Sequence, residues 1–164
     1  MKQVTVEIFK YAKEIAGTGE HRWNPSRESA DGSIPYATAV TLMDGTLTPH
    51  SYNDAHLRNP DLHALMQKIE VVDNDEFSNA FDRLPQEHHA RVTVVTTSGE
   101  RLVGKTGGDQ DDMSAPKSDA QIEQKFRNLT EDYLGTKQVN AILDDIWHLE
   151  RLENAALPPA FVLD

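Results

Sequence analysis

The stretch RESADGSIPYATAVTLMDGTLTPHSYNDAHLRNPDLHALMQKIEVV, residues 27–72, decides the fold because it contains two sharply delimited helices. The first should begin after Ser33, which suits an N-cap, and end before Gly45, which suits a left-handed stop. Its surface is apolar nearly all round, which predicts a buried helix. The second should begin after Asn59, with apolar residues at helical spacing: Leu62, Leu65, Met66 and Ile69.

The rest of the chain alternates between short strand patterns and helical patterns. Strands are predicted at residues 4–8 and 70–73, and a hairpin is predicted from the runs 91–97 and 101–105 around Ser98 and Gly99. Further helices are predicted at 75–81, from Ser118 to Gly135, and from Thr136 to about residue 152. Residues 11–27 read as a loop. These elements predict an α+β fold, with a small antiparallel β-sheet of about four strands covered by helices. They form one domain over residues 1–157, followed by a tail at 158–164.

Composition narrows the function classes. The chain has 164 residues, 38% of them hydrophobic, and a formal net charge of −11. That charge would repel a phosphate backbone, so we expect no nucleic-acid partner. Cysteine is absent, which excludes thiolate chemistry. No apolar run approaches the length that spans a membrane, and the expected location is the cytoplasm.

Several segments together carry a family resemblance. The pattern S-I-P-Y-A-x-A-V-x-L-x-D-G at 33–45 is followed by L-R-N-P-D-L-x-A-L-M-x-K-I-E-V at 57–71. Further on come S-G-E-R-L at 98–102, Lys125-Phe126 and Leu149-Glu150. In this order the segments resemble the C-terminal domain of the MmgE/PrpD family, which includes 2-methylcitrate dehydratase and cis-aconitate decarboxylase.

The resemblance implies a lid over an active-site cleft. In the family, the principal acid–base histidines and lysines come from a large helical N-terminal domain, which has no counterpart here. We therefore expect a C-terminal lid domain or small subunit of a lyase that dehydrates or decarboxylates small di- and tricarboxylates. It should use no cofactor, and it should be inactive without a helical partner domain or subunit. One departure stands out, because Gly32-Ser33 replaces the family's His-Ser step.

Four residues are candidates for facing the substrate. By their chemistry, Arg27 could pair with a carboxylate, Ser33 could offer a helix N-terminus, and Tyr36 could lend a hydroxyl. The resemblance adds Tyr11, because family members can place a tyrosine near the substrate in this region. The structural alternative is that Arg27 pairs locally, Ser33 only caps its helix and Tyr36 packs in the core. No catalytic residue is expected in this chain. No metal site is expected either, because the seven histidines lack ligand spacing and read as surface residues.

Two other functions remain open. The chain could be a stand-alone, non-catalytic binding domain that covers its interface by self-association. It could also bind a nucleotide through GERLVGKT, from Gly99 to Thr106, which matches the phosphate-loop pattern. The residues between the two glycines favour an extended strand, however, so a hairpin is the better interpretation of this segment.

Overall fold

The computed structural model describes residues 1–108 and 116–151. Contacts between Cα atoms divide the chain into two compact units, residues 1–115 and 116–164, and each is described by itself. The predicted single domain over 1–157 therefore stays a prediction, and the tail at 158–164 lies outside the described residues. None of the described helices combines the length and apolar content that crossing a bilayer requires.

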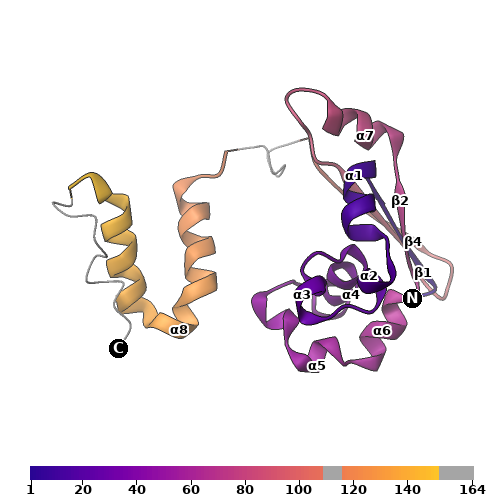
Figure 1. Ribbon diagram of the computed structural model, residues 1–164, viewed down its shortest axis with the longest axis horizontal. Helices are drawn as coiled ribbons and strands as arrows, with labels where there is room; N and C mark the ends of the chain where they lie inside the picture. The colour runs from indigo at the N-terminus through magenta and orange to yellow at the C-terminus, as the bar shows by residue number, and fades with distance from the viewer. Residues whose placement is uncertain (109–115, 152–164) are drawn as a thin grey trace. The chain divides into compact units, whose positions relative to one another are not determined.

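The first unit, which contains the helices labelled α1 to α7 in Figure 1, is built on a four-stranded sheet in the order β2-β1-β3-β4. Its strands are β1 (Gln3–Ile8), β2 (Ile69–Asp73), β3 (Ala90–Val95) and β4 (Arg101–Thr106). The α+β class, the four strands and the β3–β4 hairpin are confirmed. The sheet is mixed rather than wholly antiparallel, because β2 pairs parallel with β1. A parallel pair needs a long crossover, and the helices between β1 and β2 provide it.

Short helices fill that crossover. They are α1 (Lys10–Ala12), a π-helical turn (Lys13–Gly17), α2 (Glu20–Trp23), α3 (Arg27–Ala30), α4 (Ile34–Asp44), a 3₁₀ turn (Pro49–Tyr52), α5 (Asp54–Leu57) and α6 (Pro60–Met66). The loop predicted at 11–27 is thus wrong. Each helix there is too short to show a hydrophobic period, and long-range packing holds the chain in place. Gly17, for example, is buried so close to Val71 that a Cβ at Gly17 would lie 2.6 Å from its Cγ1.

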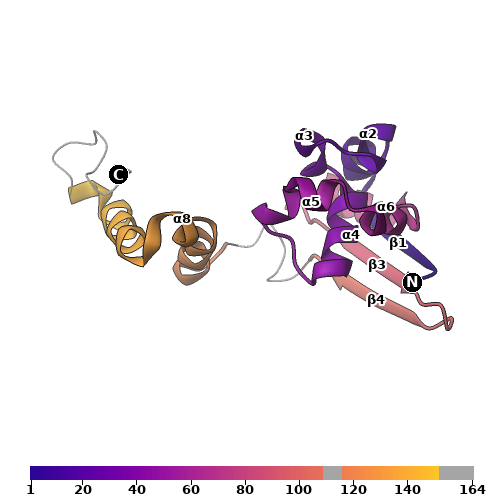
Figure 2. The ribbon, with the colours of Figure 1, turned by 90° about the horizontal axis from the view of Figure 1, so that it is seen from below.

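Helices α2 to α6 gather on one face of the sheet, as Figure 2 shows. The core between them joins β1 and β2 to α4 and α6, and its largest fully buried side chains are Tyr36, Leu62, Met66, Val4 and Val40. Ser33 caps α4 as predicted, accepting a hydrogen bond from the backbone N–H of Tyr36 at 3.1 Å. The predicted burial of α4 holds in part: Pro35, Tyr36, Ala39 and Val40 are buried, whereas its C-terminal residues Thr41, Met43 and Asp44 are exposed.

The opposite face of the sheet carries an ion pair. Arg91 on β3 donates through Nε and Nη2 to both carboxylate oxygens of Glu7 on β1, and Asn74 donates to the same carboxylate at 3.1 Å. The hydrogen bonds from Arg91, ahead of the one from Asn74, lower the pKa of Glu7 despite its partial burial. A carboxylate held in this way stabilises the fold only while it is ionised.

Glu7→Gln should lower the free energy of unfolding by about 2 kcal/mol at neutral pH, since it removes a charge-assisted pair. Because the pKa of Glu7 is lowered in the folded state, its contribution is present above the ordinary carboxyl pKa and lost as pH falls from about 4.3 downward. The stabilities of wild type and Glu7→Gln should therefore converge in acid. Urea unfolding followed by circular dichroism at several pH values measures this. A gap that stays constant down to about pH 3 would contradict it.

Helix α7 (Asp75–Asp82) follows β2 directly and agrees with the predicted helix at 75–81. The second unit contains α8 (Asp119–Trp147) and a 3₁₀ turn (Leu149–Arg151). Gly135 has non-helical dihedral angles, φ 75° and ψ 154°, so α8 consists of two helices meeting where the sequence predicts a break. Arg127 Nη2 donates to Asn140 Oδ1 across that break at 2.8 Å.

Candidate functional site

Two of the four predicted site residues, Ser33 and Tyr36, lie in the core. Ser33 is 1% exposed, and its hydroxyl donates to the backbone carbonyl of Arg22 at 2.5 Å. Tyr36 is 0% exposed, and its hydroxyl donates to the carbonyl of Ser51 at 2.5 Å. Burial raises the pKa of Tyr36. These contacts fit the structural alternative of capping and packing, and a contact with substrate stays a prediction for both residues.

The other two candidates, Tyr11 and Arg27, lie at the surface. Tyr11 in α1 is 56% exposed, and its ring stacks on Phe81 of α7 with centroids 6.1 Å apart. It borders a small cavity of about 170 Å³. Arg27 is exposed in α3. No hydrogen bond or ring contact of the described residues joins either side chain to Ser33 or Tyr36, so the four candidates do not form one cluster.

The Gly32-Ser33 step has a structural counterpart. A Cβ at Gly32 would lie 2.6 Å from Nη1 of Arg22, so the guanidinium occupies the space beside residue 32. The same Nη1 donates to the carbonyl of Ser29 at 3.3 Å. A larger residue at position 32 would have to displace this flexible side chain. The guanidinium of Arg22 can therefore occupy this position only because residue 32 is a glycine.

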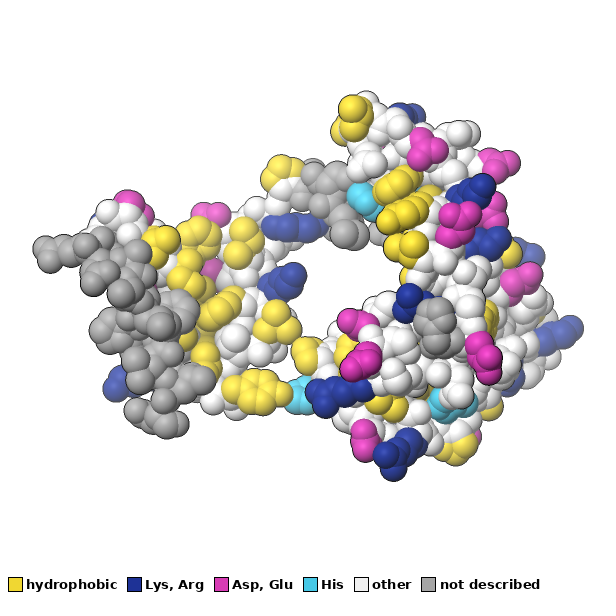
Figure 3. Space-filling model, viewed as in Figure 1, with side chains coloured by type: hydrophobic (Ala, Val, Ile, Leu, Met, Phe, Trp, Pro, Cys, Tyr) yellow, Lys and Arg dark blue, Asp and Glu magenta, His cyan; other side chains and the backbone are white. Residues whose placement is uncertain are grey.

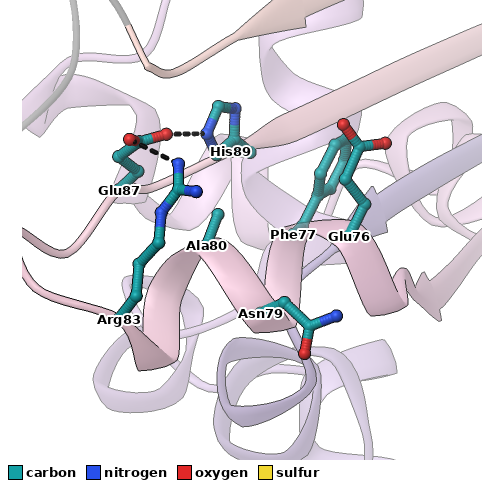
Figure 4. Close-up of a pocket in the computed structure, with 7 residues that line it drawn as sticks. All are labelled: Glu76, Phe77, Asn79, Ala80, Arg83, Glu87 and His89. Carbon is teal, nitrogen blue, oxygen red and sulfur yellow. Dashed lines mark hydrogen bonds and ion pairs between the residues drawn. The ribbon is translucent and has the colours of Figure 1, made fainter.

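A larger cavity, of about 490 Å³, opens beside α7 (Figure 4). Its lining comes from α7 and from the segment that leads into β3: Glu76, Phe77, Asn79, Ala80, Arg83, Glu87 and His89. Figure 4 shows Arg83, Glu87 and His89 pointing toward one another on one side, with Phe77 and Glu76 on the other. The volume lies in the range of small-molecule sites.

Three of these residues form a connected polar group, which we call the Arg83–Glu87–His89 cluster. Glu87 accepts from Arg83 Nη2 at 2.7 Å through one carboxylate oxygen, and its other oxygen lies 2.8 Å from His89 Nε2. The hydrogen bond with His89, followed by that from Arg83, lowers the pKa of Glu87. Glu87 therefore stays ionised near neutral pH and holds the imidazole in one orientation.

The imidazole of His89 is also held by packing. Its ring stacks on Phe77 with centroids 5.5 Å apart, and Arg91 lies over the same Phe77 ring. Gly108 passes so close that a Cβ there would lie 2.6 Å from His89 Cε1. The side chain of His89 keeps 22% of its surface exposed. It is therefore both fixed and accessible.

The sequence-based interpretation missed this cluster, because it placed all seven histidines at the surface. One signal was present: in an extended chain, residues two apart such as Glu87 and His89 point to the same side. The contribution of Arg83 could not be read in this way, because it comes from the end of a helix. The described residues 1–108 and 116–151 contain no group of three or more histidines and carboxylates placed to hold a metal ion.

The phosphate-loop match does not form a phosphate-binding loop in the structure. Residues from Arg101 to Thr106 form β4, and their register with β3 is continuous from Arg101 to Thr106. Backbone N–H groups in a strand do not curl around a phosphate as the motif requires. Residues 109–115 lie outside the described residues.

Comparison with known proteins agrees with this fold. The family model of the MmgE/PrpD C-terminal domain matches residues 1–149. The chain therefore belongs to the MmgE/PrpD family and represents its C-terminal domain.

Among curated proteins, the chain is similar to human (Homo sapiens) cis-aconitate decarboxylase, with 22% identity over 132 residues that cover 80% of this chain and 27% of that protein. The mouse (Mus musculus) cis-aconitate decarboxylase is 20% identical over 132 residues, covering 80% of this chain and 26% of its own length. The chain thus spans about a quarter of the length of these relatives.

Proposed function

We propose that this chain is the C-terminal lid of an MmgE/PrpD-type lyase and closes over a small di- or tricarboxylate held by a helical partner domain or subunit. The reaction is the decarboxylation or dehydration of that acid, with cis-aconitate and 2-methylcitrate as the first substrates to test. Cytoplasmic residence is part of the same proposal.

The observation that supports the proposal most directly is the match of the C-terminal domain model over residues 1–149. The charge of the main cavity supports the need for a partner. Arg83 is balanced there by Glu87, and Glu76 adds a second carboxylate. A cavity with this balance offers no net positive charge to a tricarboxylate, so the substrate's charges need cations from elsewhere.

An assay with and without the helical domain tests the proposal. The purified chain alone should not convert cis-aconitate or 2-methylcitrate, because it lacks a complete set of acid and base groups. Co-expression with an MmgE/PrpD helical domain from the same organism should give turnover with one of these acids. Carbon dioxide release and the absorbance of the unsaturated product measure it. Robust turnover by the chain alone would contradict the proposal.

A second candidate is a self-associating domain without catalysis. It is favoured by apolar side chains exposed on the second unit: Ile122, Leu129, Tyr133, Ile146, Trp147 and Leu149. Figure 3 shows hydrophobic side chains, in yellow, gathered over α8. Tyr133 is 73% exposed. Light scattering of the purified chain separates the two candidates. A stable oligomer that binds no helical domain would favour self-association.

A further inference from the structure

The histidines differ in the hydrogen-bond partners of their ring nitrogens. His56 has both nitrogens engaged, Nδ1 with Asn53 Oδ1 at 3.0 Å and Nε2 with Asp44 Oδ2 at 2.9 Å. The Nε2 of His63 lies 2.7 Å from the carbonyl of Leu57. These two rings serve local structure, tying turns and helix ends together.

His89 is different. Its Nε2 faces the carboxylate of Glu87 at 2.8 Å, while no residue that the structure describes makes a hydrogen bond to its Nδ1. The ring lines the 490 Å³ cavity and is 22% exposed. A carboxylate on one nitrogen and an open second nitrogen is the arrangement of a positioned acid–base histidine.

The charged groups around His89 determine what its two ring nitrogens can bind. Glu87 is the nearest carboxylate and has a lowered pKa, with Arg83 on its other oxygen. Of the other charged groups nearby, Glu76 lines the cavity and Arg91 is engaged with Glu7. An imidazolium at residue 89 would donate through Nε2 to Glu87 and keep the Nδ1–H for a ligand.

We propose that His89 is the proton donor that this domain supplies to the lyase reaction, with Glu87 as the residue that positions it. This inference rests on the proposed function. In a decarboxylation, the C–C bond to a substrate carboxylate breaks and carbon dioxide leaves. The electron pair left on carbon takes the proton from Nδ1 of His89. The neutral imidazole then regains a proton from water, so no further reactant is needed.

The first test needs no activity. In ¹⁵N–¹H spectra of the full-length chain, the Nε2–H of His89 should be visible because its hydrogen bond to Glu87 slows exchange with water. The signal is assigned by its loss in His89→Gln, and it should vanish in Glu87→Ala. A signal for His89 that is unchanged in Glu87→Ala would overturn the proposed positioning.

The second test uses the complex of the chain with its helical domain. His89→Gln should lower kcat by roughly a hundredfold or more with little change in KM, since it removes proton transfer and not binding. Glu87→Gln should lower kcat less than His89→Gln does, again with little change in KM, because the imidazole stays at the cavity but loses the carboxylate that orients it. His50→Gln is the matched control, since His50 is exposed on the 3₁₀ turn, and it should keep wild-type kcat.

The outcomes separate the two proposals. An active complex in which His89→Gln keeps kcat within about threefold of wild type overturns the role of His89 and leaves the proposed function standing. A wild-type complex without turnover on any small di- or tricarboxylate removes the proposed function, and the role of His89 falls with it. The inference is supported if His89→Gln loses kcat while the ¹⁵N–¹H signals of the other residues stay unchanged.

Discussion

Gly107→Ala should destabilise the first unit by about 4 kcal/mol, enough to unfold a domain of ordinary stability in part. Two effects add. Gly107 has φ 106°, a conformation that residues with a Cβ rarely adopt. An added Cβ would also lie 2.0 Å from the carbonyl oxygen of His88 and 2.7 Å from Cα of His89. Both contacts are with backbone, so no side chain can rotate away.

Gly99→Ala provides the matched control for Gly107→Ala. Gly99 in the hairpin turn also has a positive φ, 88°, but a Cβ there meets nothing within 4 Å. Only backbone strain is then introduced, and the expected loss is about 1 kcal/mol. Urea unfolding of the two variants compares strain alone with strain plus collision. Equal losses would mean that the chain near Gly107 does not approach His88 as described.

Tyr36→Ala should lower the free energy of unfolding by about 4 kcal/mol, the second large effect, because it empties a fully buried site where α4 packs against the 3₁₀ turn of Ser51 and Tyr52. Tyr36 is 0% exposed, and its ring stacks on Tyr52 with centroids 5.8 Å apart. Its loss removes apolar burial, the ring contact and a buried hydrogen bond together. Chemical denaturation monitored by tryptophan fluorescence measures the change.

Tyr36→Phe separates these contributions. It keeps the ring and removes only the hydroxyl, which leaves the carbonyl of Ser51 without that donor. The expected cost is about 1–3 kcal/mol, clearly below that of the alanine variant. If Tyr36 instead served substrate binding alone, Tyr36→Phe would leave stability unchanged and weaken substrate affinity in the complex.

The sequence predicted best where a local signal marks both ends of an element. Ser33 and Gly45 delimit α4, Asn59 begins α6, and Gly135 divides α8 as expected. The hairpin of β3 and β4 was also readable, because its two strands are joined by a tight turn. Capping and turn patterns depend on residues only a few positions apart, so they can be recognised without knowledge of the rest of the chain.

Prediction failed where the deciding contact is distant. The short helices between residues 10 and 23 have no period of their own and depend on contacts such as that of Gly17 with Val71. The parallel pairing of β2 with β1 joins residues more than 60 apart along the chain, as Val4 with Ile69 shows. No local pattern distinguishes this pairing from an antiparallel one.

The candidate site shows the same division. Ser33 and Tyr36 were predicted to face the substrate because of their hydroxyl groups. In the folded chain, both hydroxyls donate hydrogen bonds to backbone carbonyls inside the core. By contrast, no local sequence pattern marks Arg83, Glu87 or His89 as part of a functional site. They became a cluster only when the end of α7 and the start of β3 met beside Gly108.

By itself, then, the amino-acid order determined the α+β class, the limits of the main helices and the family, because capping, periodicity and motif order are properties of neighbouring residues. Tertiary structure alone decided which strand lies beside β1, which hydroxyls are buried and which histidine faces a carboxylate at a cavity. The physical reason is that burial and hydrogen-bond partners are set by contacts between distant segments, and those contacts exist only once the chain has folded.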